Sequence, residues 1–181
     1  MRRECTADES LQTVQEAVSH AGLEPRQLEL ELTETILMKD VEHTLQQLER
    51  LRSLGFQVAI DDFGTGYSSL KYLNRFPVDK LKIDQDFVRK LPYKAESVQL
   101  VNTIITMAQN MSLGVVAEGV ETCDQMSFLV ESGCESVQGF LMARPMSHEQ
   151  IVSQHEKLQL CCASCHEACP PSGRDETSRP S

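Results

Sequence analysis

Residues 60–70 read IDDFGTGYSSL, and this stretch decides the fold prediction. The apolar run at 56–60 before it predicts a strand, which ends in two adjacent carboxylates, Asp61 and Asp62. Two glycines follow at once, and glycine lets a backbone turn sharply and approach a ligand closely. The stretch therefore predicts a strand that carries charge at its C-terminal end. One alternative stays open at this point, a turn in which the aspartates only accept backbone hydrogen bonds.

The same order, a strand followed by a helix, recurs along the chain. Apolar residues alternate in the expected strands and recur every three or four positions in the expected helices. Asp40 is placed to cap a helix, and both Thr122 with Gln125 and Ser147 with Gln150 have the spacing of a capping box. The pattern predicts strands near 28–32, 56–60, 81–83, 115–117 and 136–140, and helices near 8–21, 41–54, 68–75, 98–111, 122–130 and from 148 on. A polar loop is expected at Thr33 and Glu34.

This alternation predicts a parallel α/β fold. In such folds ligands bind beyond the carboxyl ends of the strands, in closed barrels and in open sheets alike. Periodicity alone does not separate these two architectures.

Polar residues stand at the expected ends of all five strands. They are Glu31, Asp61 with Asp62, Lys82, Glu118 and Gln138. Parallel strands bring their carboxyl ends together, and carboxylates gathered in this way either raise their pKa values or recruit a cation. Oxygen ligands favour Mg²⁺ or Mn²⁺, and two such ions are a common solution for phosphodiester hydrolysis. The alternative is that these acids belong to unrelated loops and are solvated.

The motifs in their order resemble those of the EAL domain, a family of cyclic di-GMP phosphodiesterases with a (β/α)8 barrel of the TIM type. The matching segments are LELTE at 30–34, IDDFGTGYSSL at 60–70, LKID at 81–84, AEGVE at 117–121 and QGF at 138–140. The resemblance covers roughly residues 10–155.

The resemblance implies a role for each matching residue. Glu31, Asp61, Asp62 and Glu118 would hold two Mg²⁺ or Mn²⁺ ions, and Lys82 would position the attacking water. Gln138 would be a polar contact at the floor of the site. Glu34 and Glu121 would anchor the loop at 63–69, which couples the site to a dimer interface in the family. The substrate would be cyclic di-GMP, cleaved to linear pGpG in bacterial second-messenger signalling; no substrate-binding residue is assigned.

The chain departs from the family pattern at its front. The Glu-Ala-Leu motif and a metal-binding asparagine of the family are not found in the sequence, and only about five of eight β/α units are expected, in residues 1–160. We therefore expect a partial barrel with impaired hydrolysis. The alternative is an inactive remnant that binds a nucleotide or another protein. A homo-oligomer or a partner chain is expected to supply the missing strands.

The composition limits the classes of partner and the location that we expect for this protein. The net charge of −10 argues against binding to a nucleic-acid polymer, because such binding depends on an excess of lysine and arginine. Neither a membrane-spanning run nor a signal peptide is recognised, so a cytoplasmic protein is expected. The cysteine-rich segment 161–181 is expected to be a disordered tail; zinc binding and haem attachment are the alternatives for its cysteines.

Overall fold

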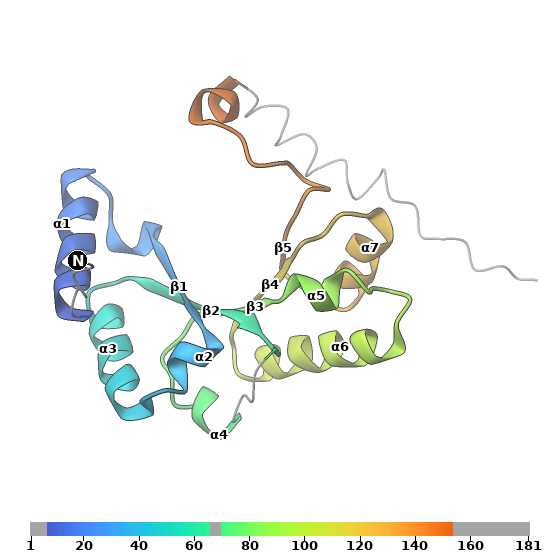
Figure 1. Cartoon of the computed structure of the whole chain (residues 1–181), viewed down its shortest axis with the longest axis horizontal. Helices are drawn as coiled ribbons and strands as arrows, with labels where there is room; N and C mark the ends of the chain where they lie inside the picture. The colour runs from blue at the N-terminus through green and yellow to red at the C-terminus, as the bar shows by residue number, and fades with distance from the viewer. Residues whose placement is uncertain (1–6, 66–69, 154–181) are drawn as a thin grey trace, which may run out of the picture. The chain divides into compact units, whose positions relative to one another are not determined.

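The computed structural model describes residues 7–65 and 70–153. The chain divides into two compact units, residues 1–81 and 82–181, whose elements are labelled in Figure 1. The strand β3 (Lys80–Ile83) begins in the first unit and ends in the second. The expected tail at 161–181 and part of the glycine-rich loop lie outside the described residues.

The first unit alternates helices with two strands before β3. The strands β1 and β2 are parallel and pair Leu30 with Val58 and Leu32 with Ile60. The backbone of Asp79, just before β3, donates to the carbonyl oxygen of Val58 at 2.9 Å. The elements of the first unit are α1 (Ala7–His20), the 3-10 helix η1 (Pro25–Gln27), β1 (Glu29–Thr33), α2 (Glu34–Leu37), α3 (Val41–Ser53), β2 (Gln57–Phe63) and α4 (Leu70–Leu73).

The core of the first unit forms where α3 packs on β2. Leu48 and Leu51 lie one turn apart on α3 and are buried, as are Val58 and Ile60 of β2. The Asp40 carboxylate accepts a hydrogen bond from the His43 amide and so caps α3. The apolar face of α3 therefore packs against the buried side chains of β2.

The second unit holds two further parallel strands and their helices. Here β4 pairs with β5 in the register Val116 with Ser136, Ala117 with Val137 and Glu118 with Gln138. The elements are α5 (Gln85–Val88), α6 (Ala95–Asn110), β4 (Gly114–Glu118), α7 (Cys123–Glu131) and β5 (Ser136–Gln138). Residues 148–153 are also helical.

The core of the second unit forms between α6, α5 and β4, which contact one another. One face of α6 is buried through Val101, Ile104 and Ile105, while Val115 and Ala117 are the buried residues of β4. Because strand side chains alternate, the burial of Val115 and Ala117 leaves Val116 and Glu118 on the opposite face of β4.

Most of the predicted elements are confirmed, including both capping boxes, in which each Ser or Thr and its Gln exchange hydrogen bonds. Two local predictions are wrong, and two short helices were not predicted. Glu34 does not lie in a polar loop but begins the short helix α2. β5 ends at Gln138 rather than at 140, and α5 and η1 were not predicted. These helices have four residues or fewer, about one turn, which is too short for an apolar period to show.

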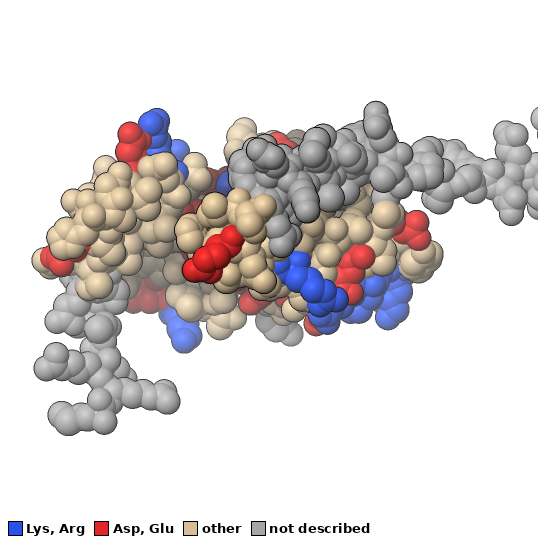
Figure 2. All heavy atoms as spheres, turned by 90° about the horizontal axis from the view of Figure 1, so that it is seen from above, with Lys and Arg blue, Asp and Glu red and all other residues tan. Residues whose placement is uncertain are grey.

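The surface carries charges of both signs. On the face shown in Figure 2, basic side chains stand beside acidic ones. Among the ion pairs of the first unit, Arg75 Nη2 lies 3.0 Å from Glu42 Oε1. None of the helices among the described residues has the length and apolar character that crossing a bilayer requires.

Candidate functional site

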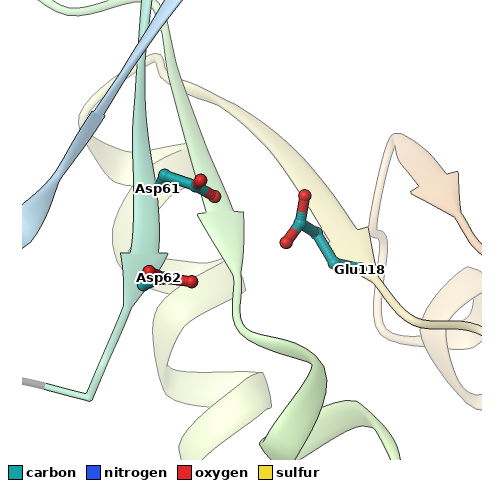
Figure 3. Close-up of side chains that lie close together, drawn as sticks. All are labelled: Asp61, Asp62 and Glu118. Carbon is teal, nitrogen blue, oxygen red and sulfur yellow. The ribbon is translucent and has the colours of Figure 1, made fainter.

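The first unit presents one group of predicted site residues at the end of β2. Val58, Ala59 and Ile60 are buried, whereas Asp61 and Asp62 are only half-buried. Asp62 has a φ of 54°, a left-handed conformation that is uncommon outside glycine but is tolerated best by aspartate and asparagine. Figure 3 shows both aspartate side chains projecting to the same side of β2. The left-handed residue thus interrupts the alternation of the strand and presents two adjacent carboxylates together.

Two hydrogen bonds to the Asp62 backbone hold the turn after this residue. Its carbonyl oxygen accepts from the Thr65 amide at 3.4 Å and from the Thr65 hydroxyl at 2.9 Å. Gly64, with a φ of 98°, supplies a second left-handed residue in this turn. The left-handed conformations of Asp62 and Gly64 therefore form the turn that directly follows the carboxylates.

Glu31 lies on the same face of the first unit as Asp61. The β1–β2 register places Glu31 beside Ala59 and Thr33 beside Asp61, and paired residues of parallel strands share a face. Glu31 is exposed. On this face the Glu29 carboxylate also pairs with Lys80 Nζ at 2.6 Å, which joins the start of β1 to the start of β3.

Glu34 is the first residue of α2 and is 3% exposed. Its Oε2 accepts a hydrogen bond from the Gly64 amide at 3.2 Å. The contact joins the end of β1 to the turn that follows Asp62. Glu34 therefore contacts the loop in which the resemblance gives it an anchoring role.

The second unit presents its own group of predicted site residues, at the ends of β3, β4 and β5. Lys82 Nζ lies 2.7 Å from Glu118 Oε1, and Lys82 is 5% exposed. Gln138 pairs in register with Glu118 and shares its face. Figure 3 shows Glu118 at the end of β4. This unit thus gathers an ammonium group, a carboxylate and an amide on one face, at the carboxyl ends of its strands.

A cavity of about 250 Å³ opens beside these residues. Glu118, Glu121 and Gln138 line it from the β4 and β5 side, and Gln85, Arg89 and Phe140 line it together with two glycines. The Glu121 amide donates to Gln125 Oε1 at 2.8 Å, so the start of α7 fixes this acid at the cavity. Glu121 therefore borders the same space as Glu118.

Two glycines allow the close packing around this cavity. A Cβ on Gly119, whose φ is 70°, would lie 2.6 Å from the Cβ of Gln85. A Cβ on Gly139 would lie 2.2 Å from the Val120 carbonyl oxygen. Both distances are far below any real carbon contact, so the approach of α5 to β4 and of the segment after β5 to Val120 depends on glycine.

Three of the cavity residues were given no role in the site from the sequence. Gln85 and Arg89 are i and i+4 along the chain, and Arg89 Nη2 donates to Gln85 Oε1 at 2.9 Å. This i, i+4 spacing could have placed both residues on one side of a helix, but α5 was not predicted. Phe140, 49% exposed, was expected within a strand rather than beyond it.

The acids that the sequence singled out offer carboxylate oxygens, the ligand type that hard divalent ions prefer. Glu31, Asp61 and Asp62 come from the first unit and Glu118 from the second. Lys82 lies beside Glu118, and Gln138 lies on the same face. Each unit thus presents its predicted site residues at the carboxyl ends of its strands, where an α/β fold binds its ligands.

Comparison with known sequences identifies relatives with a stated activity. Cyclic di-GMP phosphodiesterase NbdA of Pseudomonas aeruginosa is 51% identical over 133 residues, and the bifunctional diguanylate cyclase/cyclic di-GMP phosphodiesterase MucR of the same organism is 45% identical over 141 residues. The matches cover 74% and 78% of this chain but only 17% and 21% of those proteins. The chain thus spans about a fifth of the length of these curated relatives.

Solved structures agree in fold. The PaMucR phosphodiesterase in complex with c-di-GMP matches with a TM-score of 0.77 and 44% identity, over 81% of this chain and 59% of that one. The manganese/c-di-GMP complex of Klebsiella pneumoniae BlrP1 matches with a TM-score of 0.72 and 36% identity, over 77% of this chain and 36% of that one. These similarities confirm the predicted fold, part of a TIM-type α/β barrel.

A model of one protein family matches residues 3–145, which is most of the chain, and its description is the EAL domain. The motif order, the parallel strands with polar carboxyl ends and the sequence relatives agree with it. The chain belongs to the EAL domain family.

Proposed function

We propose that this chain provides metal ligands and the water-positioning lysine of a cyclic di-GMP phosphodiesterase. Glu31, Asp61, Asp62 and Glu118 would bind two divalent ions, Mg²⁺ or Mn²⁺. The observation that carries the proposal is the buried Lys82 ammonium at 2.7 Å from Glu118, at strand ends that also present Gln138. The names of the relatives NbdA and PaMucR support phosphodiesterase activity, and the manganese complex of BlrP1 supports the use of a divalent ion.

The reaction would open one phosphodiester bond of cyclic di-GMP. A water molecule would lose a proton as its oxygen bonds to phosphorus, and the P–O3′ bond would break as O3′ takes up a proton, giving linear pGpG. When bound, the ions supply Lewis acidity and lower the pKa of water. The residues of this chain would position the attacking water and support the site.

Lys82 is suited to stabilise charge that develops during the reaction. Its ammonium group is almost fully buried, so its interaction with a nearby negative charge is less screened than at the surface. Glu118 holds that group in place at 2.7 Å. We propose that Lys82 orients the attacking water and offsets charge on the phosphate oxygens.

Glu34, Glu121 and Gln138 would support the site without binding metal. Glu34 contacts Gly64 directly, which supports the proposed anchoring of the loop after Asp62. Glu121 borders the cavity next to Glu118, and Gln138 stands beside Glu118 in the register. We also propose, from the family resemblance, that the chain assembles as a dimer, which light scattering would check.

Metal binding tests the proposal. We expect Asp61→Asn and Glu118→Gln each to weaken Mn²⁺ binding to the full chain by at least about tenfold, because each loses a ligand charge. Glu49→Gln is the matched control, since Glu49 is exposed on α3; Glu42 is less suitable because it pairs with Arg75. Calorimetric titration measures the affinities. Equal losses in all three variants would contradict the metal site.

A turnover assay distinguishes hydrolysis of cyclic di-GMP from binding without hydrolysis. Cyclic di-GMP is incubated with the chain and Mn²⁺, and pGpG is quantified by chromatography. Release of pGpG that Lys82→Met abolishes would support the phosphodiesterase. A chain that binds Mn²⁺ and cyclic di-GMP but releases no pGpG would instead be an inactive binding module.

A further inference from the structure

Two residues that line the cavity of the second unit have no part in the proposed metal site. They are Arg89, which lies one turn of backbone beyond Gln85, and Phe140. The cavity has a volume of about 250 Å³, which is below the usual size of a pocket for a whole small molecule. It suits one planar part of a larger ligand, such as a base.

Arg89 is held in place but keeps donors for a ligand. Its Nη2 donates to Gln85 Oε1 at 2.9 Å, and its Nη1 lies 3.8 Å from Asp86 Oδ1. A guanidinium group has five N–H donors in a rigid plane, more than these two contacts use. The side chain is 54% exposed, so a ligand in the cavity can reach it.

Gly119 explains why the arginine lies at this cavity. The Gln85 Cβ would be 2.6 Å from any Cβ at position 119, so the start of α5 packs directly against the end of β4. Arg89 follows Gln85 at i+4 and therefore lies on the same side of the helical turn. The contact thus brings a cation to the edge of a site whose other proposed residues are mainly acids.

Phe140 offers a flat apolar surface at the same cavity. The ring is 49% exposed, and the Arg144 guanidinium lies 4.5 Å from its centroid. That distance is within the range of a cation–π contact, which helps to hold the ring. Exposed aromatic rings are common stacking surfaces for nucleobases.

We propose that Arg89 recognises a guanine base of the bound dinucleotide, with Phe140 as the surface on which the base packs. A planar guanidinium can donate two parallel hydrogen bonds to O6 and N7 of guanine. Adenine carries an amino group in place of O6, so one of the two bonds would be lost and replaced by two opposed donors. Arg89 would therefore determine the preference for guanine over adenine. This inference rests on the proposed function of the same site.

Binding of two cyclic dinucleotides to the full chain tests the inference. Cyclic di-GMP and cyclic di-AMP are titrated calorimetrically in Ca²⁺, an ion with which BlrP1 forms a c-di-GMP complex. We expect the wild type to prefer cyclic di-GMP, and Arg89→Ala to reduce that preference by about 5- to 150-fold, the usual range for one bidentate contact. Cyclic di-AMP affinity should change less than twofold.

Two further variants separate geometry from charge. Arg89→Lys keeps the charge but loses the planar pair of donors, so it should also lose most of the preference. Lys90→Ala is the control, because Lys90 is the neighbouring cation and lines a different cavity; it should keep the wild-type preference. Mn²⁺ affinity should be unchanged in all three variants, because none alters a proposed metal ligand.

The outcomes distinguish this inference from the proposed function. If the wild type binds cyclic di-GMP with a guanine preference and Arg89→Ala keeps that preference, the role of Arg89 is refuted while the proposed function stands. If the wild type binds both dinucleotides equally, the guanine recognition is refuted. If it binds neither, both proposals fail.

Discussion

Replacing Gly139 with alanine should destabilise the second unit by about 2–6 kcal/mol. A Cβ at this position would lie 2.2 Å from the carbonyl oxygen and 2.3 Å from the amide nitrogen of Val120, whereas ordinary contacts begin at 3.4 Å. Both atoms belong to the backbone, so no side chain can rotate away. The two segments would have to separate by about 1 Å.

That separation would break two hydrogen bonds. The Val120 amide donates to Gln138 O at 3.1 Å, and the Leu141 amide donates to Val120 O at 3.0 Å. Val120 is fully buried, so its released groups would not reach water. A buried polar group left without a partner costs about 1–3 kcal/mol, and two such losses give the range above.

Urea unfolding followed by far-UV circular dichroism measures the total effect, and hydrogen exchange at the Val120 and Leu141 amides reports the local one. Gly22→Ala is the control, because Gly22 has a φ of 66° but nothing within 4 Å of the added Cβ. It should cost only the backbone strain, about 1–2 kcal/mol. The packing argument is refuted if Gly139→Ala is no more destabilising than this control and both amides keep their wild-type exchange rates.

Two other predictions concern single hydrogen bonds. Glu34→Ala removes the acceptor of the Gly64 amide, so that amide should exchange at least about tenfold faster, while the exposed-site variant Glu49→Ala leaves it unchanged; identical Gly64 exchange in both would contradict the contact. Asp124→Asn should lower the pKa of Tyr93, because the Asp124 carboxylate accepts the tyrosine hydrogen bond at 2.5 Å and, through that bond and its charge, raises this pKa above its ordinary value of 10.0. Tyrosinate absorbance should then rise at lower pH in the variant, and superimposable titrations would show that the bond does not form in solution.

The regular elements could be predicted because their causes are local. Helix α3 begins after Asp40, and α7 begins after Thr122, because each cap bonds to a backbone amide three residues away. The strands show in the alternation of short apolar runs, and a polar residue at each strand end locates the candidate site. Each of these signals is contained in a segment of about ten residues, so it can be recognised in the sequence without the tertiary structure.

The tertiary structure decided what depends on distant residues. Glu34 was expected in a polar loop, but it is buried and contacts Gly64, which lies 30 residues further along the chain. The 2.7 Å contact of Lys82 with Glu118 and the close approach that Gly119 allows are likewise consequences of packing.

The sequence by itself therefore determined the alternation of strand and helix and the carboxylates at the strand ends, because hydrogen bonds and apolar periods between near neighbours encode both. It did not determine that Arg89 and Phe140 border one cavity with Glu118. These residues are brought together by a four-residue helix and a glycine contact, and no local pattern records the proximity of segments that are distant in the chain.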